Sequence, residues 1–143
     1  MNYKANSEEA LSIKVSDYLK VQYPNVIYHF DYGSGLKMTK GQAIRQKRLN
    51  KDKSYPDLFI AKSKEIGWTE VGDDFIPTKW MHGLYVELKK EGTRLKKKNG
   101  EWTSEHIADQ AKMLEKLRDD GYKAEFAVGF DEAKEIIDNY LNN

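Results

Sequence analysis

Two charged side chains interrupt the clearest strand that the sequence predicts. Residues 84–89 are Leu-Tyr-Val-Glu-Leu-Lys, and strand side chains alternate between faces, so Tyr85, Glu87 and Lys89 share one face. If this strand is covered on both faces, a carboxylate and an ammonium there must be paired, metal-bound or hydrated. An edge strand with a solvated Glu and Lys would give the same pattern, so this segment alone does not decide between the two interpretations.

A second acidic residue, Asp57, begins the preceding predicted strand directly after a proline. Pro-Asp pairs are common in turns, where the aspartate accepts hydrogen bonds from nearby backbone amides, and this is the alternative to a functional role. If the two strands are neighbours in a sheet, Asp57 can approach Glu87 and Lys89. Two carboxylates held close repel each other unless a cation or a proton intervenes, and hard oxygen ligands suit Mg²⁺ or Mn²⁺.

An amide interrupts the apolar face of a predicted helix. Gln110 stands three residues after Ile107 and four before Leu114. A buried amide needs hydrogen-bond partners, so we expect Gln110 to reach a polar site beneath its helix. A glutamine at the boundary of the core, bonded to backbone, is an equal alternative.

The elements that must position these residues follow from apolar periodicity and from helix-capping and helix-breaking residues. We expect helices over residues 7–22, 39–49 and 104–119, and a last helix capped by Asp131. We expect strands over residues 26–31, 55–61, 84–89 and 122–129, and a hairpin excursion within residues 62–82. This alternation predicts an α/β fold with a central mixed β-sheet flanked by helices.

Length and composition bound the class of protein. The 143 residues contain no repeat or low-complexity tract, so we expect a single domain over residues 1–143. The absence of cysteine excludes disulfides, cysteine-ligated zinc and thiol catalysis. No apolar run approaches the roughly 18 residues that a membrane span needs, and the amino terminus lacks a signal-peptide pattern. These features favour a cytoplasmic protein.

Basic residues are concentrated in two segments, although the net charge is only +1. The first segment runs from Lys37 to Lys53 and the second from Lys89 to Lys98. Together they could hold a polyanion such as a nucleic acid, whereas a solvated loop and a solvated helix face would account for the same charges. The candidate phosphate-binding residues are Lys40, Arg45, Lys47, Arg48, Arg94, Lys96 and Lys97.

Taken in order, these motifs resemble a known nuclease superfamily. Pro56-Asp57, then Glu87-Leu88-Lys89, then a helix bearing Gln110 resemble the pattern of the PD-(D/E)XK nucleases. The segments YPDLFI and GLYVELKKEGTRL resemble its VRR-NUC branch, whose small members occur in many bacteriophages. The likeness runs from the first helix to the last and implies a restriction-endonuclease-like core.

The resemblance implies a role for each matching residue. Asp57 and Glu87 would ligate a catalytic Mg²⁺ or Mn²⁺. Lys89 would orient the attacking water and stabilise charge on the phosphate, and Gln110 would support the site from its helix.

An acidic residue of the first helix often joins the metal site in this family. Glu8 fits that place best and Glu9 is its rival, although both also suit a helix amino terminus.

The function that the resemblance implies is metal-dependent hydrolysis of phosphodiester bonds in DNA, with selectivity for branched or junction DNA. DNA would be the partner, a homodimer is compatible with the family, and a phage-encoded chain would act in the host cytoplasm. Two other interpretations remain. One is a catalytically silent nucleic-acid-binding module on the same fold. The other is a protein-interaction module whose Trp68, Phe75 and Trp80 form an exposed patch while Asp57 and Glu87 lie far apart.

Overall fold

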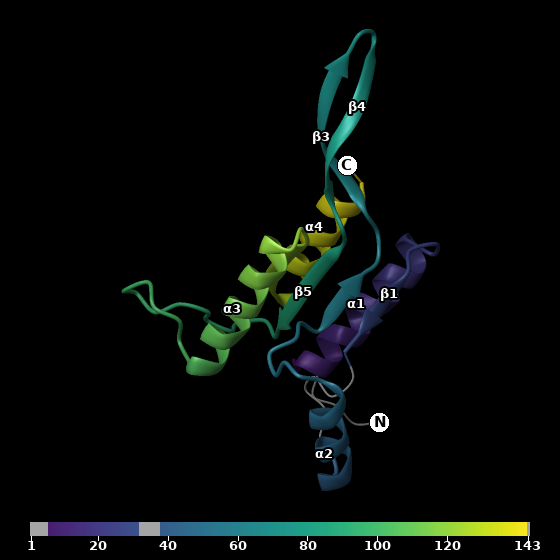
Figure 1. Ribbon diagram of the computed structural model, residues 1–143. Coiled ribbons are helices and arrows are strands. Elements are labelled where there is room, and N and C mark those ends of the chain that lie inside the picture. The colour runs from purple at the N-terminus through teal and green to yellow at the C-terminus, as the bar shows by residue number, and fades with distance from the viewer. Residues whose placement is uncertain (1–5, 32–37, 143) are drawn as a thin grey trace.

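The computed structural model describes residues 6–31 and 38–142, and a four-stranded mixed sheet forms its centre (Figure 1). The strand order is β1-β2-β5-β6, with antiparallel pairing of β1 with β2 and of β2 with β5, and parallel pairing of β5 with β6. The predicted mixed sheet is thereby confirmed. Its strands are β1 (Tyr28–Phe30), β2 (Leu58–Ile60), β5 (Leu84–Lys89) and β6 (Lys123–Val128).

Helices cover both faces of this sheet (Figure 1). On one face, α1 (Glu8–Gln22) and α4 (Gly129–Leu141) contribute Val15 and Ile137 to the main core. On the other face, α3 (Glu105–Asp119) buries Leu114 against Tyr85 and Ala124. The remaining helix, α2 (Lys40–Leu49), has no buried residue and lies at the end of the molecule opposite the β3–β4 hairpin.

The central strand β5 is buried along its whole length. Leu84, Val86 and Leu88 face the core formed with α1 and α4, whereas Tyr85 faces α3. The edge-strand interpretation of Glu87 and Lys89 is therefore wrong, because β5 has a partner on each side and a helical layer over each face.

Short polar residues begin three of the helices as the sequence predicts. Ser7, Thr39 and Ser104 each accept a backbone hydrogen bond as N-caps, and Gln42 completes a capping box on α2.

The predicted cap of the last helix is wrong. Helix α4 begins at Gly129, directly after β6, and has no side-chain cap. Gly129 has a φ of +84°, which glycine adopts without strain because it has no Cβ. The chain therefore passes from strand to helix without a linker. Asp131 consequently lies in the first turn, where its charge suits the positive end of the helix.

Residues between β2 and β5 form the expected hairpin. Strands β3 (Lys64–Val71) and β4 (Asp74–Met81) pair only with each other among the described residues, and they project from the body of the molecule (Figure 1). No helix in the described part of the chain has the length and apolarity that a bilayer crossing requires.

A carboxylate ties the first and last helices together. Asp138 of α4 accepts hydrogen bonds from the hydroxyls of Tyr18 at 2.5 Å and Tyr23 at 2.6 Å, and from Lys134 Nζ at 2.9 Å. Burial alone would raise the pKa of Asp138, but these three donors hold it below its ordinary value. The ionised form is therefore the one that the fold stabilises.

Replacing Asp138 by Ala should lower the free energy of unfolding by about 1–3 kcal/mol, because it leaves two tyrosine hydroxyls without their acceptor. The lowered pKa means that this stabilisation is present above the ordinary value of 3.8 and is lost as the pH falls below it. Urea unfolding at neutral and acidic pH measures both effects. Glu135→Ala, an exposed acid on the same helix, is the matched control, and equal stability of the two variants would contradict the prediction.

Candidate active site

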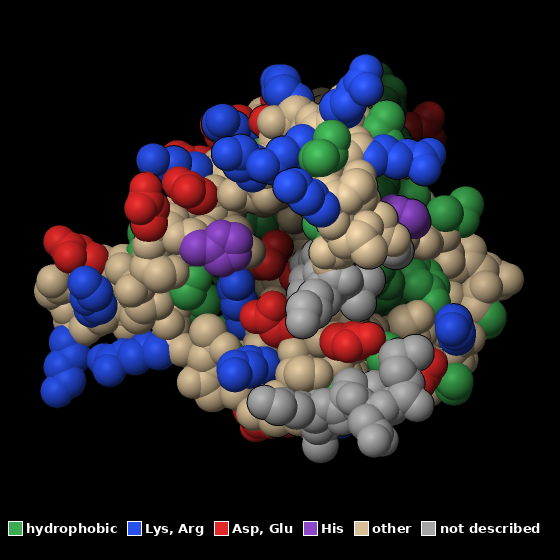
Figure 2. All heavy atoms as spheres, turned by 90° about the horizontal axis from the view of Figure 1, so that it is seen from below, with side chains coloured by type: hydrophobic (Ala, Val, Ile, Leu, Met, Phe, Trp, Pro, Cys, Tyr) green, Lys and Arg blue, Asp and Glu red, His purple; other side chains and the backbone are tan. Residues whose placement is uncertain are grey.

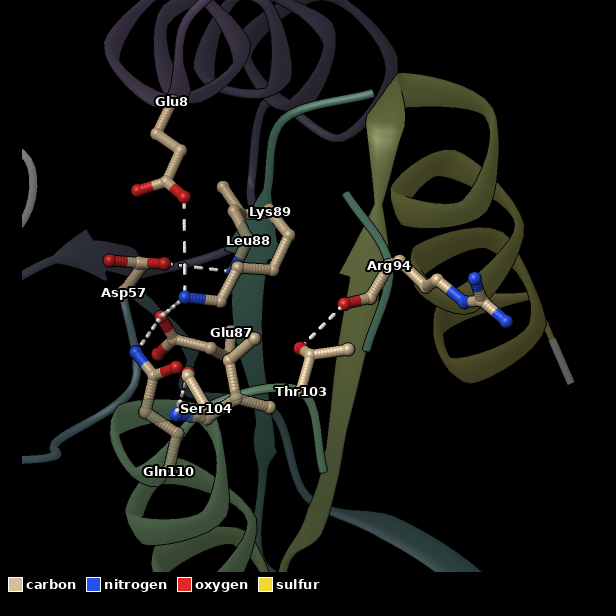
Figure 3. Close-up of polar contacts among 10 residues, drawn as sticks. Glu8, Asp57, Glu87, Leu88, Lys89, Arg94, Thr103, Ser104 and Gln110 are labelled. Atoms are coloured by element: carbon tan, nitrogen blue, oxygen red, sulfur yellow. Dashed lines mark hydrogen bonds and ion pairs between the residues drawn. The ribbon is translucent and has the colours of Figure 1, made fainter. Parts of the chain in front are cut away.

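Four side chains make up the buried polar and charged residues of the described chain. Asp57, Glu87, Lys89 and Gln110 are 5%, 3%, 6% and 6% exposed. They are the same four residues that the sequence motifs indicate, and they meet where β2 begins and β5 ends (Figure 3). Burying charge is unfavourable unless the groups are paired or serve a function, so this cluster is the candidate active site.

Antiparallel pairing of β2 with β5 positions Asp57 in the cluster. Leu58 pairs with Val86, so the residue before β2 lies beside the end of β5. The Leu88 amide donates a hydrogen bond to Asp57 Oδ2 at 2.8 Å, and the Asp57 carbonyl accepts one from the Asp31 amide at 2.7 Å. Asp57 thus bonds a backbone amide, as the turn alternative expects, but across the sheet rather than within a local turn.

Helix α3 supplies the amide that holds Glu87. Gln110 Nε2 donates to Glu87 Oε1 at 2.7 Å (Figure 3). The other amide atom, Gln110 Oε1, is buried and has no hydrogen-bond partner. The prediction that Gln110 reaches a polar site beneath its helix is confirmed, and one buried acceptor remains available there.

The ammonium of Lys89 lies between two acids from different elements. Its Nζ is 3.9 Å from Glu87 Oε1 and 4.0 Å from Glu8 Oε1. Figure 3 shows α1 with Glu8 and α3 with Gln110 approaching the strand residues from opposite sides. The Glu8 side chain is 40% exposed, so it forms the solvent-facing border of the cluster. Of the two first-turn acids, it is the one that pairs with Lys89.

Burial shifts the carboxyls of Asp57 and Glu87 toward the protonated form. Desolvation raises the pKa of Asp57. Desolvation together with the charge and hydrogen bond of Asp57 raises the pKa of Glu87 to about 9, which the attraction of Lys89 does not offset. The pair therefore retains a proton that a divalent cation could replace.

The donor set fits a hard divalent cation with few protein ligands. Within residues 6–31 and 38–142, no three acidic or histidine side chains form a metal-binding group. The two carboxylates and the unpartnered Gln110 oxygen are nevertheless oxygen donors of the kind that Mg²⁺ takes, and Mg²⁺ commonly binds one or two carboxylates while keeping water and substrate phosphate. Asp57 and Glu87 would hold such an ion, with Glu8 at its border.

A cavity of about 540 Å³ lies beside the cluster, between α2 and the strand ends. Its lining includes Asp31, Lys47 and Tyr55, and Asp31 contacts Asp57 through its backbone. Figure 2, which views the molecule from the α2 end, shows Lys and Arg side chains gathered beside a hollow that contains acidic side chains.

Sequence reasoning missed two residues of this cavity. Asp31 directly follows β1, the strand that pairs with β2, and burial raises the pKa of its carboxyl. The Tyr55 hydroxyl donates a hydrogen bond to the Tyr85 hydroxyl at 2.8 Å. Tyr85 lies on the face of β5 that also carries Glu87 and Lys89. An acid at the end of a predicted strand was the available signal for Asp31.

The predicted phosphate-binding residues lie in two separate places. Lys40, Arg45, Lys47 and Arg48 belong to α2, and Arg45 and Lys47 line cavities next to Asp31. Lys37, which begins the first basic segment, lies outside the described residues.

The second basic segment folds on itself. Arg94 Nε donates to the Lys96 carbonyl at 3.0 Å, and Lys96 Nζ lies 4.6 Å from the centre of the Trp102 ring. The Arg94 side chain is directed away from the carboxylates (Figure 3). The structure thus does not bring Arg94, Lys96 or Lys97 into the cluster.

No protein-family model matches the chain, and no curated protein matches it. Among solved structures, the chain is similar to a VRR_NUC domain protein, with a TM-score of 0.64 and 23% sequence identity. The similarity covers 98% of this chain and 92% of that protein's chain. A likeness at this identity concerns the fold, and it agrees with the resemblance that the motifs of Asp57, Glu87 and Lys89 indicate. The chain therefore has the fold of that VRR_NUC domain protein, a mixed α/β fold whose mixed sheet is flanked by helices.

Proposed function

We propose that this protein is a metal-dependent nuclease that hydrolyses phosphodiester bonds in DNA. The observation that supports it most is the convergence of buried Asp57, Glu87, Lys89 and Gln110 at the end of the sheet. The interaction-module alternative expects Asp57 and Glu87 to lie far apart, whereas each affects the pKa of the other. The preference for DNA, and for branched or junction DNA, rests on the family resemblance.

Asp57 and Glu87 would hold Mg²⁺ or Mn²⁺. When bound, such an ion lowers the pKa of a coordinated water and polarises a phosphoryl oxygen. The Leu88 amide fixes Asp57, and Gln110 fixes Glu87, so both carboxylates are oriented before substrate arrives. Orienting the ligands in advance avoids reorganisation during the reaction.

Lys89 supplies a positive charge that the protein holds in place. In hydrolysis, the oxygen of a water bonds to phosphorus, one phosphorus–oxygen ester bond breaks, and the leaving oxygen takes a proton. Negative charge builds on the phosphoryl oxygens meanwhile. The Lys89 ammonium, buried and placed between Glu87 and Glu8, would stabilise that charge in surroundings that screen it little.

Helix α2 is suited to the sugar-phosphate backbone. It carries Lys40, Arg45, Lys47 and Arg48, has no acid in its first turn and buries no side chain in the core. Lys47 lines the cavity beside the cluster and Arg45 lines a second cavity at Asp31, so a backbone bound along α2 would lead toward Asp57. Contacts to phosphates position a nucleic acid without reading its sequence.

Replacing Glu87 by Gln, or Lys89 by Met, should lower Mg²⁺-dependent cleavage at least about 100-fold, because each removes a ligand or a fixed charge at the reacting phosphate. Nicking of supercoiled plasmid under single-turnover conditions measures the loss. Glu115→Gln and Lys116→Met, on the exposed surface of α3, are matched controls. Equal cleavage by wild type and Glu87→Gln would refute the assignment, and DNA binding without any metal-dependent cleavage would favour the silent binding module.

In protein kept free of metal by a chelator, Glu87→Gln should be more stable than wild type above pH 4.5. The folded wild type keeps Glu87 protonated up to a pKa of about 9, whereas the unfolded chain releases that proton near 4.5. Wild-type stability therefore falls as the pH rises between these values, and the advantage of the variant grows over the same window.

Thermal unfolding at several pH values measures this difference. Adding Mg²⁺ or Mn²⁺ should stabilise wild type and leave Glu87→Gln nearly unchanged, because a bound cation compensates the ionised pair. Parallel pH profiles, or equal stabilisation of both proteins by the cation, would contradict the proposed metal ligands.

Replacing both Arg45 and Lys47 by Ala should weaken DNA binding equally for unrelated sequences. The slope of log affinity against log salt should fall by about 1 for each phosphate contact removed. Fluorescence anisotropy with labelled duplex, flap and four-way DNA, in the Glu87→Gln background, measures affinity without cleavage. Lys116→Ala is the control, and an unchanged salt slope would exclude α2 from the interface.

The same titration tests the second basic segment. Arg94, Lys96 and Lys97, changed together to Ala, should also reduce the salt slope if that segment contacts phosphates. Comparing the three DNA forms identifies the preferred substrate.

A further inference from the structure

Tyr55 is an exposed aromatic residue beside the candidate active site, and the chemistry described above gives it no role. It stands two residues before Asp57, and 40% of its surface is exposed. It lines the cavity of about 540 Å³ between α2 and the strand ends. We call this space the Tyr55 cavity.

Contacts with the sheet fix the orientation of the Tyr55 ring. Its hydroxyl donates to the Tyr85 hydroxyl at 2.8 Å, and the two rings are nearly perpendicular, with 5.4 Å between their centres. Tyr85 is buried and in turn stacks on Phe59, with 4.5 Å between the ring centres. A ring that is already held in place loses little conformational freedom when a flat ligand stacks on it.

The rest of the cavity lining combines apolar and charged side chains. Leu49, at the end of α2, is 72% exposed and adds apolar surface to that of Tyr55. A flat base joined to phosphates suits such a lining, because the base offers an apolar face and the phosphates offer negative charge. The charged residues of the lining are three lysines and two aspartates: Lys47, Lys51, Lys53, Asp31 and Asp52.

The short separation along the chain places Tyr55 near the carboxylates. Two residues of extended chain span at most about 7 Å, which limits the distance between the Cα atoms of Tyr55 and Asp57. Successive bases of a stacked strand rise about 3.4 Å. A base that reaches Tyr55 therefore belongs to a nucleotide within a few positions of a phosphate at Asp57.

We propose that the Tyr55 cavity takes one unpaired base of the nucleic acid. The base stacks on the Tyr55 ring, and the lysines of the lining contact the phosphates beside it. This inference rests on the proposed nuclease function and defines its substrate more closely. The substrate is a strand that has an unpaired nucleotide next to the cleaved bond.

A base that stays paired in a duplex cannot occupy the cavity. Neighbouring bases cover its faces, so it must first leave the stack, and this is least costly where the strand is mismatched or already single. Stacking on an aromatic side chain favours every base, because each has a π-face. The Tyr55 cavity therefore selects unpaired nucleotides without selecting a sequence.

The other exposed aromatic residues of the described chain lie elsewhere. Trp68, Phe75 and Trp80 all belong to the β3–β4 hairpin, at the end of the molecule opposite α2 (Figure 1). They provide matched controls, because they are aromatic and exposed but distant from the carboxylates.

Fluorescence anisotropy tests the cavity with a perfect duplex and with the same duplex carrying a single-stranded flap. Glu87→Gln protein in a chelator binds without cleaving, and it should bind the flap form more tightly. Adding Tyr55→Leu should weaken binding of the flap form about tenfold and leave the perfect duplex unchanged, because only the unpaired base loses its stacking partner.

Two further variants separate stacking from a structural role. Tyr55→Phe keeps the ring but removes the hydrogen bond to Tyr85, and it should retain the preference for the flap form. Phe75→Leu removes an exposed aromatic ring from the hairpin and should change neither affinity. Loss of the preference in Tyr55→Phe, or an equal loss in Phe75→Leu, would overturn the inference.

Photocross-linking locates the base without any change at Tyr55. 5-Iododeoxyuridine, placed in turn at each of the first unpaired positions of 5′ and 3′ flaps, cross-links to aromatic side chains that stack on it. Mass spectrometry of digested, irradiated Glu87→Gln complexes should identify Tyr55. Cross-links confined to Trp68, Phe75 or Trp80, or no cross-link in a saturated complex, would overturn the inference, as would failure to bind any DNA.

These measurements also separate failure of this inference from failure of the proposed function. Metal-dependent cleavage by wild type without a cross-link at Tyr55 would end the base-binding role and leave the nuclease function standing. A cross-link at Tyr55 without metal-dependent cleavage would refute the nuclease function and support the Tyr55 cavity as a base-binding site.

Discussion

Burial of charge on the α3-facing side of β5 is the constraint on which the rest of the arrangement depends. Glu87 and Lys89 occupy a strand with a partner on each side and helices over both faces, so neither can reach bulk water without disrupting the core. Neighbouring residues must therefore supply the hydrogen bonds and the opposite charges that water would otherwise provide. The Gln110 amide and the Glu8 carboxylate do this directly, and each arrives on a helix that the core fixes in place.

The chain assembles this environment from four separate regions. Helix α1 brings Glu8, the start of β2 brings Asp57, β5 brings the Glu-x-Lys pair and α3 brings Gln110. The helices cover opposite faces, yet both reach the same end of the sheet, where Figure 3 shows their side chains meeting. Rigid elements hold the polar groups, while the basic helix α2 stands outside the core, where it could adapt to a bound polymer.

Much of this could be predicted from the sequence, because local rules and burial agree over most of the chain. Alternation identified β5, and the mismatch of Gln110 with its apolar helix face indicated a buried polar contact. Other features depend on tertiary geometry. Asp31 contacts Asp57 through a backbone hydrogen bond, and no local sequence pattern specifies the strand pairing that creates this contact. The start of α4 was misplaced because Gly129 makes a turn that needs no linker, so the conventional cap at Asp131 was not required.

Gly121 joins two distant parts of the fold in a way that restricts what evolution can place there. It follows α3 with a φ of +94°, and its carbonyl accepts a hydrogen bond from the amide of His82, just after the hairpin. A Cβ at position 121 would lie 2.6 Å from the His82 ring. A side chain at position 121 would therefore meet both a strained backbone and the His82 ring, so this position should remain glycine in homologous chains even where residue 82 is smaller.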